Sequence, residues 1–292
     1  MLVTKFCKPS TTTDQDFRDF ITAVRTAFTD LGWVRTSDTG QIDPTTAVKP
    51  AATSQIVGYD IMRFGDALHA TAPFFLKIDY GSASGSLSFN QLGLQIGTGT
   101  NGAGTLTGNV GTRLTVGSGA TDNNLRACIF AGNASRIAFC LWYDTANPNR
   151  AQPVIIERSH ADDGSDTGER VDMAAVLSTS SSWFQSVPNP LVMLATPVRG
   201  VAANLPCLIP QAAVSGTFGV NVGAFPIFPN NDGPLRNPML GMFLYVSADM
   251  ATLQDVSVTM YGVLRTYRTM GWLSYAAYGL GGATTSPMLL VS

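Results

Sequence analysis

The apolar positions near the start of the chain follow a helical spacing. Between residues 17 and 31 they recur every three or four positions, which places them on one face of an α-helix. This stripe consists of Phe17, Phe20, Ile21, Val24, Phe28 and Leu31. Thr13 followed by Asp16 fits an N-cap, and Gly32 suits the C-terminal end of a helix. The pattern predicts an amphipathic helix whose apolar face packs on its own domain or is buried against another chain.

After a polar, aperiodic segment at residues 34–54, the spacing changes to the alternation that is typical of β-strands. In residues 74–80, apolar side chains occupy every second position. Similar short runs occur at residues 87–96, 125–130, 136–143, 154–157, 191–195, 242–246 and 256–264. About nine such strands with turn-rich gaps predict a mainly β fold, an antiparallel β-sandwich or jelly roll. To it we add the N-terminal amphipathic helix and extended terminal arms.

These patterns divide the chain into three expected parts. Residues 1–54 form an N-terminal arm, the helix and a linker; residues 55–278 form a β-sandwich domain with long inserted loops; residues 279–292 form a C-terminal arm. The Gly- and Thr-rich stretch Gly97–Ala120 predicts a long loop, or a hairpin that becomes ordered against a partner. The apolar run Met288–Val291 follows a flexible spacer and predicts pairing with a sheet edge or a neighbouring molecule.

The four cysteines are spread along the chain without the CxxC spacing of a zinc site. They are Cys7, Cys128, Cys140 and Cys207. Cys128 and Cys140 are equally distant from Ala134, in a run of turn residues, so a hairpin there would place the two thiols across neighbouring strands. Two interpretations stay open: buried free thiols, which a reducing cytoplasm favours, or a cross-strand pair.

Charge is scarce for a chain of this size. Only 13% of the 292 residues are Asp, Glu, Lys or Arg, and the formal net charge is −2. The charged fraction is about half the usual quarter, and the absence of a basic surplus argues against nucleic-acid binding. No apolar run is long enough to span a membrane, and the first residues do not resemble a signal peptide. We therefore expect no membrane partner and a chain that folds inside the cell that makes it.

No constellation of residues indicates a reaction. The sequence GTGTNG at residues 97–102 echoes a dinucleotide-binding fingerprint but lacks the helix and the acidic residue that should follow it. The densest polar cluster, Glu157–Glu169, is not spaced like a calcium loop, so we expect a solvated turn. The sequence has no GxSxG motif whose serine His160 could activate, so we do not expect a catalytic triad and expect His160 to be exposed. We predict no catalytic, metal-binding or cofactor-binding residues and no enzymatic activity.

One segment resembles a known class of proteins. Residues 58–81, which read GYDIMRFGDALHATAPFFLKIDYG, are similar to stretches in structural proteins of tailed bacteriophages. The helix with its DFRDF and LGW phrases, the Gly- and Thr-rich stretch and the Glu157–Gly168 segment fit the same pattern. The similarity covers about half of the chain. It implies a virion protein of the tail, baseplate or neck, and it carries no catalytic residues with it.

Composition and resemblance together predict a non-enzymatic virion component, made in the host cytoplasm, that binds copies of itself and other virion proteins. Desolvating neutral hydroxyls and amides costs less free energy than desolvating charges, so a neutral surface is suited to burial by neighbouring subunits. The candidate contact residues are Phe17, Phe20, Val24, Phe28, Thr98, Thr100, Asn101, Met288, Leu289, Leu290 and Val291. The alternative is a receptor- or glycan-binding module of a tail fibre or spike, in which Trp142, Tyr143, Trp183 and Phe184 line a sugar-binding groove.

Overall fold

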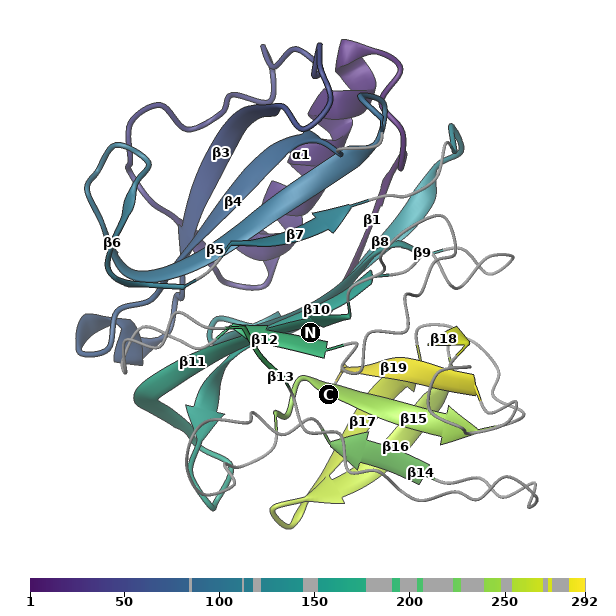
Figure 1. The fold of residues 1–292 in the computed structure, drawn as a ribbon. Helices are drawn as coiled ribbons and strands as arrows, with labels where there is room; N and C mark the ends of the chain where they lie inside the picture. Colours follow the sequence, from purple (N-terminus) through teal and green to yellow (C-terminus); the bar gives the residue numbers. More distant parts are fainter. Residues whose placement is uncertain are drawn as a thin grey trace.

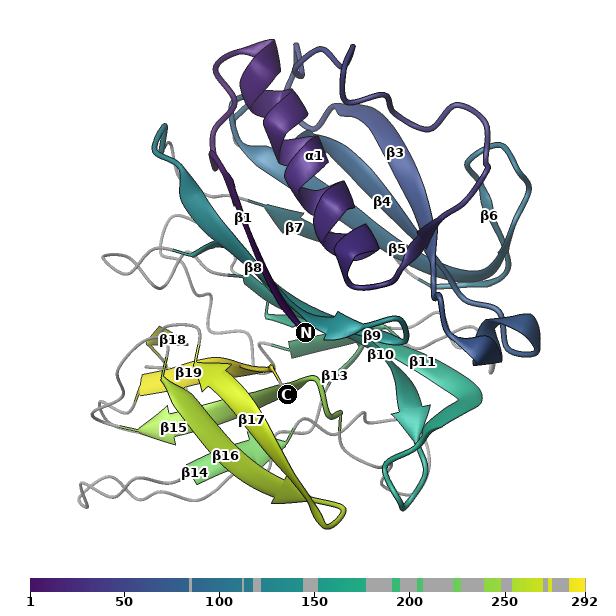
Figure 2. The same cartoon turned by 180° about the vertical axis from the view of Figure 1, so that it is seen from behind.

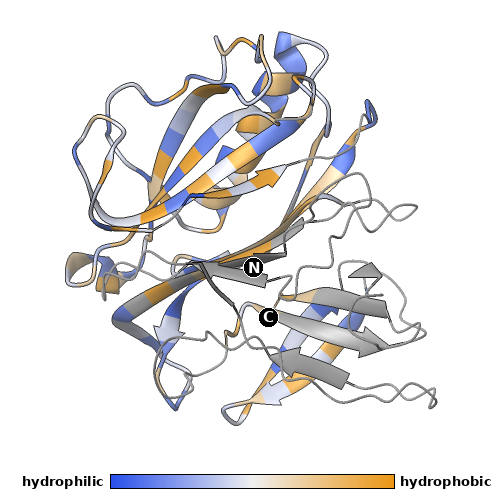
Figure 3. Ribbon diagram, in the orientation of Figure 1, coloured by the Kyte–Doolittle hydropathy of each residue, from blue (hydrophilic) through white to orange (hydrophobic). Residues whose placement is uncertain are grey.

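The computed structural model consists of three antiparallel sheets and, in the part of the chain it describes, one α-helix (Figure 1). The described residues are 1–83, 86–111, 113–117, 122–143, 152–176, 191–194, 204–206, 223–226, 239–247, 254–269, 273–274 and 284–291. The predicted mainly β, antiparallel class is confirmed. Colouring by hydropathy shows the alternation that predicted strands, for example along β4 and β5 (Figure 3).

The helix α1, Asp14–Asp30, begins and ends where its sequence signals predict. The Thr13 side chain accepts a hydrogen bond from the Asp16 N–H, and the Asp16 carboxylate accepts one from the Thr13 N–H, which together make a capping box. Gly32, just past the helix, has a φ of +89°, a conformation that glycine adopts without strain. Before the helix, β1 (Leu2–Cys7) is a strand and not a free arm.

The N-terminal sheet follows the helix in the sequence and has the order β2-β3-β4-β5-β6, with β7 also paired to β5. Its strands are β2 (Val34–Arg35), β3 (Ile56–Arg63), β4 (Phe75–Ser82), β5 (Asn90–Thr100), β6 (Leu106–Val110) and β7 (Leu114–Gly117). A short 3-10 helix, η1 (Ala67–Ala70), connects β3 to β4. Residues 36–54 contain no helix or strand, whereas Val34 and Arg35, which the aperiodic segment 34–54 also includes, form β2.

The central sheet has the order β1-β8-β9-β10-β11-β12-β13. Its later strands are β8 (Arg126–Asn133), β9 (Arg136–Tyr143), β10 (Gln152–His160), β11 (Asp166–Val176), β12 (Leu191–Leu194) and β13 (Asn204–Pro206). The hairpin predicted around Ala134 is the β8–β9 turn. Consecutive strands lie side by side, as in a meander, so this order does not confirm a jelly roll, in which consecutive strands alternate between sheets.

The C-terminal sheet has the order β14-β15-β19-β17-β16, with β18 also paired to β19. Its strands are β14 (Gly223–Pro226), β15 (Met242–Ser247), β16 (Asp255–Met260), β17 (Val263–Thr269), β18 (Leu273–Ser274) and β19 (Thr284–Leu290). The segment predicted to be a C-terminal arm therefore contributes β19, which pairs with β15 and β17 of the same chain. Figure 1 shows the central sheet between the other two sheets.

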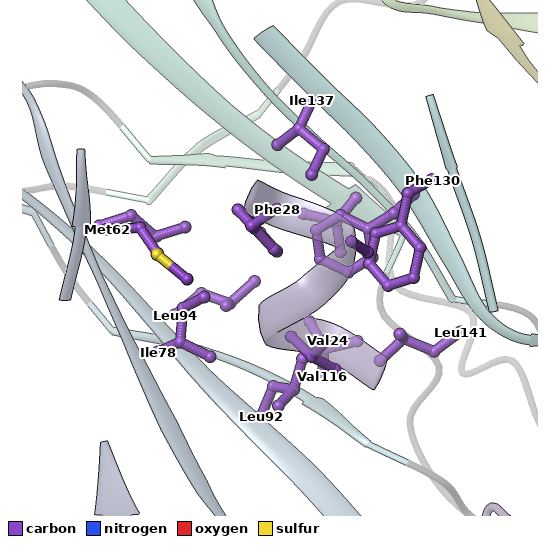
Figure 4. Packing of buried hydrophobic residues seen from close by; sticks show 14 of the residues in the cluster. Val24, Phe28, Met62, Ile78, Leu92, Leu94, Val116, Phe130, Ile137 and Leu141 are labelled. Atoms are coloured by element: carbon purple, nitrogen blue, oxygen red, sulfur yellow. The ribbon is translucent and has the colours of Figure 1, made fainter. Parts of the chain in front are cut away.

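The main core lies between the N-terminal and central sheets, with α1 inserted between them (Figures 2 and 4). Phe28 contacts the rings of Trp33, Phe130 and Phe139 edge-on, with centroid distances of 5.1–6.3 Å. Nearer the start of the helix, Phe20 stacks on Trp142 with a ring-centroid distance of 5.6 Å. The helix joins residues of both sheets into one cluster, to which Val3, Cys7, Trp33, Ile42 and Ala47 also belong.

Candidate functional site

The most unusual group of side chains is a buried charged cluster where the β10–β11 hairpin meets the C-terminal sheet, which we call the His160 cluster. It consists of Glu157, His160, Asp166 and Ser135, together with the backbone of residues 240–241. Glu157 is 1% exposed and His160 is 7% exposed. The expectation of a solvated turn with an exposed histidine is therefore wrong for these two residues. The turn itself, residues 161–165, is mostly exposed and carries the Gly and Asp residues that turn geometry favours.

Local strand geometry positions the cluster. A β-bulge between Arg158 and His160 shifts the register and places His160 opposite Asp166 on β11. Ser135, in the β8–β9 turn, donates a hydrogen bond from its hydroxyl to the second oxygen of Asp166. Glu157 accepts hydrogen bonds from the Leu240 and Gly241 N–H groups at 2.6 and 2.8 Å. The cluster thus joins two hairpins of the central sheet to the segment that enters β15.

The two carboxylates hold a proton on His160. The His160 Nε2 lies 3.2 Å from the Glu157 Oε1, and its Nδ1 lies 3.2 Å from the Asp166 Oδ1. Burial by itself lowers the pKa of a histidine, but here the hydrogen bonds and charges of the two carboxylates raise the pKa to about 9. Burial raises the pKa of Asp166, but its bonds to His160 and Ser135 reverse this and lower the pKa. At neutral pH the protonated ring of His160 therefore lies between two carboxyl groups.

This arrangement is unsuited to nucleophilic catalysis of the triad type. In a triad the serine donates to a neutral histidine, which acts as general base. Here the Ser135 hydroxyl donates to Asp166, and His160 is already protonated at neutral pH. A protonated, buried histidine cannot accept the proton of a nucleophile. What the cluster can do is hold elements together through charge-assisted hydrogen bonds.

The residue next to Glu157 connects the central sheet to the N-terminal sheet. Arg158 is 1% exposed, and its guanidinium forms a bidentate ion pair with the carboxylate of Asp66, which precedes η1. The guanidinium carbon lies 4.8 Å from the centre of the Phe64 ring. Because successive side chains of a strand point to opposite faces, Glu157 binds the C-terminal sheet and Arg158 binds the N-terminal sheet. Two adjacent residues of β10 therefore tie the three sheets together.

A second buried carboxylate fastens α1 to the N-terminal sheet. Asp60 on β3 is fully buried and accepts hydrogen bonds from Arg25 of the helix, Arg35 of β2 and the Tyr80 hydroxyl of β4. Burial, followed by the charge of Asp60, raises the pKa of Tyr80 well above its usual value, so the hydroxyl keeps its proton and donates. This network shares the carboxylate among three elements, and it was not predicted from the sequence.

The structure places the helical candidate residues inside the molecule. Phe17, Phe20, Val24 and Phe28 are 0% exposed and lie in the core between the two sheets. Of the two interpretations of the helix, packing on its own domain is the one observed. The proposed contact of these four side chains with another chain is wrong for this structure, because the core already covers their whole surface.

The candidate residues of the Gly- and Thr-rich stretch support a hairpin of this chain. Residues 97–110 form the end of β5, a turn and β6, so the ordered hairpin needs no partner strand. The Thr98 hydroxyl accepts a hydrogen bond from the Asn109 N–H, and the exposed Asn101 accepts two, from the N–H groups of Ala103 and Thr105. Thr100 donates to Asp38 of the linker. Residues 112 and 118–120 lie outside the described residues.

The C-terminal candidates are buried against their own sheet. Met288 and Leu289 are 0% exposed and Leu290 is 8% exposed, and Met288 and Leu290 form a small core with Tyr267. Val291 is half-buried, and its N–H donates to the Thr266 carbonyl at 2.9 Å. The run therefore pairs with strands of this chain, which agrees with the predicted sheet pairing but leaves little of these side chains for a neighbour.

The aromatic residues considered for a sugar-binding groove give that function little support. Trp142 is 2% exposed and its ring is stacked on Phe20 inside the core. Trp183 and Phe184 lie outside the described residues, as does the Tyr143 side chain. In the described part of the chain, no group of His, Cys, Asp or Glu side chains is arranged to hold a metal ion. No helix there has both the length and the apolar character needed to cross a bilayer.

The comparisons with known proteins add no identity to this picture. The sequence matches no family model, no curated protein and no solved structure. The functional interpretation therefore depends on the geometry and the sequence pattern.

Proposed function

We propose that this chain is a non-enzymatic structural subunit of a tailed-bacteriophage virion, in the tail, baseplate or neck, that assembles with copies of itself and with other virion proteins. The observation that carries the proposal is the β5–β6 hairpin. It projects an exposed, entirely uncharged surface, and its own hydrogen bonds already hold it in shape. An ordered, neutral surface favours assembly because binding then requires neither the ordering of a loop nor the desolvation of a charge.

The hairpin belongs to a longer uncharged stretch. No Asp, Glu, Lys, Arg or His occurs between Asp79 and Arg113. Thr105, Thr107 and Asn109 of the hairpin are all exposed. The Asp38 carboxylate, which approaches the hairpin from the linker, is 8% exposed and accepts hydrogen bonds from Thr100 and the Gly104 N–H. The charges near the hairpin are thus turned inward, and hydroxyls and amides face outward.

The rest of the proposal concerns the three sheets that carry the hairpin. They act as a sandwich-type scaffold, and the contacts of Glu157 and Arg158 hold the sheets together. Single exposed apolar side chains add further contacts with neighbouring subunits. Phe6 on the edge strand β1 is 62% exposed, and Leu125, which precedes the paired strand β8, is 63% exposed. In the proposal, these two apolar side chains contact a neighbouring subunit.

The test is the assembly state of the purified full chain, alone and mixed with the other structural proteins of the particle, measured by analytical ultracentrifugation. Asn109→Lys places one charge on the exposed hairpin and is expected to weaken assembly at least about tenfold, which corresponds to about 1.4 kcal/mol. Thr259→Lys, an equally exposed position on β16, is the matched control and is expected to assemble normally.

Electron microscopy supplies an independent readout. An antibody against the chain is expected to decorate the tail, baseplate or neck of particles from the strain that carries the gene. A chain that stays monomeric in every mixture and is missing from the particles would contradict the proposal. If Asn109→Lys assembled as well as the wild type, the hairpin would not be an assembly surface.

A further inference from the structure

Two buried thiols meet where the first strand ends on the central sheet. The Cys7 Sγ lies 3.3 Å from the Cys128 Sγ, and both side chains are fully buried. In the antiparallel ladder, Cys7 pairs with Arg126 and Cys128 pairs with Lys5. The two cysteines are therefore diagonal neighbours on one face of the sheet, and their sulfurs are in contact.

Cys140, the thiol that the sequence suggested as the partner of Cys128, faces the other way. It pairs with Ile129, the neighbour of Cys128, and it belongs to β9. The adjacent residues Phe139 and Leu141 join the core cluster that also contains Cys7 and Cys128, whereas Cys140 does not. Because side chains alternate along a strand, Cys140 points to the opposite face of the sheet. The cross-strand pair is thus Cys7 with Cys128.

The backbone around Cys128 holds its sulfur in place. A register shift between Ala127 and Ile129 breaks the β8–β9 ladder, and Trp142 on the opposite strand has a φ of +52°. The Trp142 N–H, freed from the ladder, donates to the Cys128 Sγ at 3.5 Å. The Cys128 sulfur is therefore fixed by two contacts, from Trp142 on one side and from Cys7 on the other.

We propose that Cys7 and Cys128 form a disulfide when the chain meets a small-molecule disulfide such as oxidised glutathione, and that this bond fastens the edge strand β1 to the central sheet. The inference goes beyond the proposed virion role and does not depend on it. A disulfide has a sulfur–sulfur distance of about 2.05 Å, so the two sulfurs, which lie 3.3 Å apart, must approach each other further before they can bond.

The reaction balances as two thiol–disulfide exchanges. The thiolate of one cysteine attacks the small disulfide, whose sulfur–sulfur bond breaks, and the first small thiol leaves with the proton that the cysteine lost. The thiolate of the second cysteine then attacks the mixed disulfide, and a second small thiol leaves with that proton. The two protein sulfurs together lose two electrons, and the small disulfide gains them and is reduced to two thiols.

The oxidation is expected to be slow in the folded chain. The hydrogen bond with Cys128 and burial raise the pKa of Cys7 well above its usual value, so few thiolates exist at neutral pH. Both thiols belong to the main core beside α1, so a small disulfide reaches them only when this core opens locally. Once formed, the bond joins residues 121 positions apart. Closing so large a loop strongly reduces the conformational entropy of the unfolded chain, which stabilises the folded state.

The experiment equilibrates the purified full chain in glutathione buffers until the product ratio is constant, alkylates the remaining thiols and maps peptides without reduction. We expect a Cys7–Cys128 peptide, with alkylated Cys140 and Cys207, and a melting temperature about 5 °C higher than that of the reduced chain. Cys140→Ser is the matched control and should keep both results. Cys7→Ser should lose both.

Two results would overturn the proposal. One is a circular-dichroism spectrum that stays native while both Cys7 and Cys128 remain alkylated at every glutathione ratio. The other is a linkage of Cys128 to Cys140 or Cys207 in place of Cys7. Peptide mapping of the wild type decides between these results without any variant, so a Cys7→Ser chain that fails to fold does not weaken the test.

Discussion

Alkaline pH is expected to loosen the connection between the central and C-terminal sheets, because it removes the proton of His160. The folded chain holds this proton up to about pH 9, whereas an unfolded histidine releases it near pH 6.5. The raised pKa therefore contributes its full stability below pH 6.5, and this contribution is lost as the pH rises through 9. Above that range, Glu157 and Asp166 face a neutral ring and lose the charge-assisted hydrogen bonds that the imidazolium gave them.

The size of the effect follows from the two pKa values. The difference between 6.5 and about 9, at about 1.4 kcal/mol per pH unit, gives a loss of about 3 kcal/mol in the free energy of unfolding. His160 is 7% exposed, so solvent screening reduces this figure little. A loss of this size is a substantial part of the total stability of a typical domain, which is about 5–15 kcal/mol.

The assay is urea unfolding followed by tryptophan fluorescence between about pH 6 and pH 9.5, for the wild type, His160→Gln and His69→Gln. The stability advantage of the wild type over His160→Gln should shrink by about 3 kcal/mol across this range. Burial lowers the pKa of His69, the other histidine, so His69→Gln should follow the wild type above about pH 7.5, where a histidine with such a pKa no longer titrates. Parallel pH curves for the wild type and His160→Gln would refute the assignment of a raised pKa to this residue.

Three further predictions concern stability and use the same unfolding assay. Thr13→Ala removes the N-cap of α1 and is expected to lower the free energy of unfolding by about 1 kcal/mol; no change would mean that the capping box is dispensable. Gly104→Ala places a Cβ 2.2 Å from the Tyr59 ring and should destabilise by at least about 1 kcal/mol more than its control Gly102→Ala, which needs the same positive φ but meets no atom within 4 Å. Equal effects would exclude the clash. Phe28→Ala should cost about 3–5 kcal/mol, whereas a helix face free for a partner would lose under about 1 kcal/mol.

Local features were predictable from the sequence because their causes are local. The capping box needs only Thr13 and Asp16, three residues apart, and the observed helix begins at the next residue after Thr13. The strand Arg136–Tyr143 has the predicted bounds, since alternation and the preceding turn both lie in adjacent residues. The helical stripe likewise predicted that a face is buried, but the identity of the covering surface depends on contacts with strands distant in the sequence.

The charged clusters could not be predicted for the same reason. Glu157, Arg158 and His160 look like the start of a polar turn, and their burial depends on Leu240, Gly241 and Asp66, which lie up to 92 positions away. The one signal in the sequence was the isolated charge pair at the end of the apolar run of β10. In a chain with so few charged residues, a charge that continues a strand pattern is a reason to look for a buried partner.

The position of β19 sets an order on folding. This strand lies between β15 and β17, yet its residues are translated after both. Until residues 284–290 leave the ribosome, β15 and β17 each present an open edge, the kind of surface that nascent chains use for wrong pairings. The C-terminal sheet can therefore be completed only once β19 has been made, although β15 and β17 are available earlier.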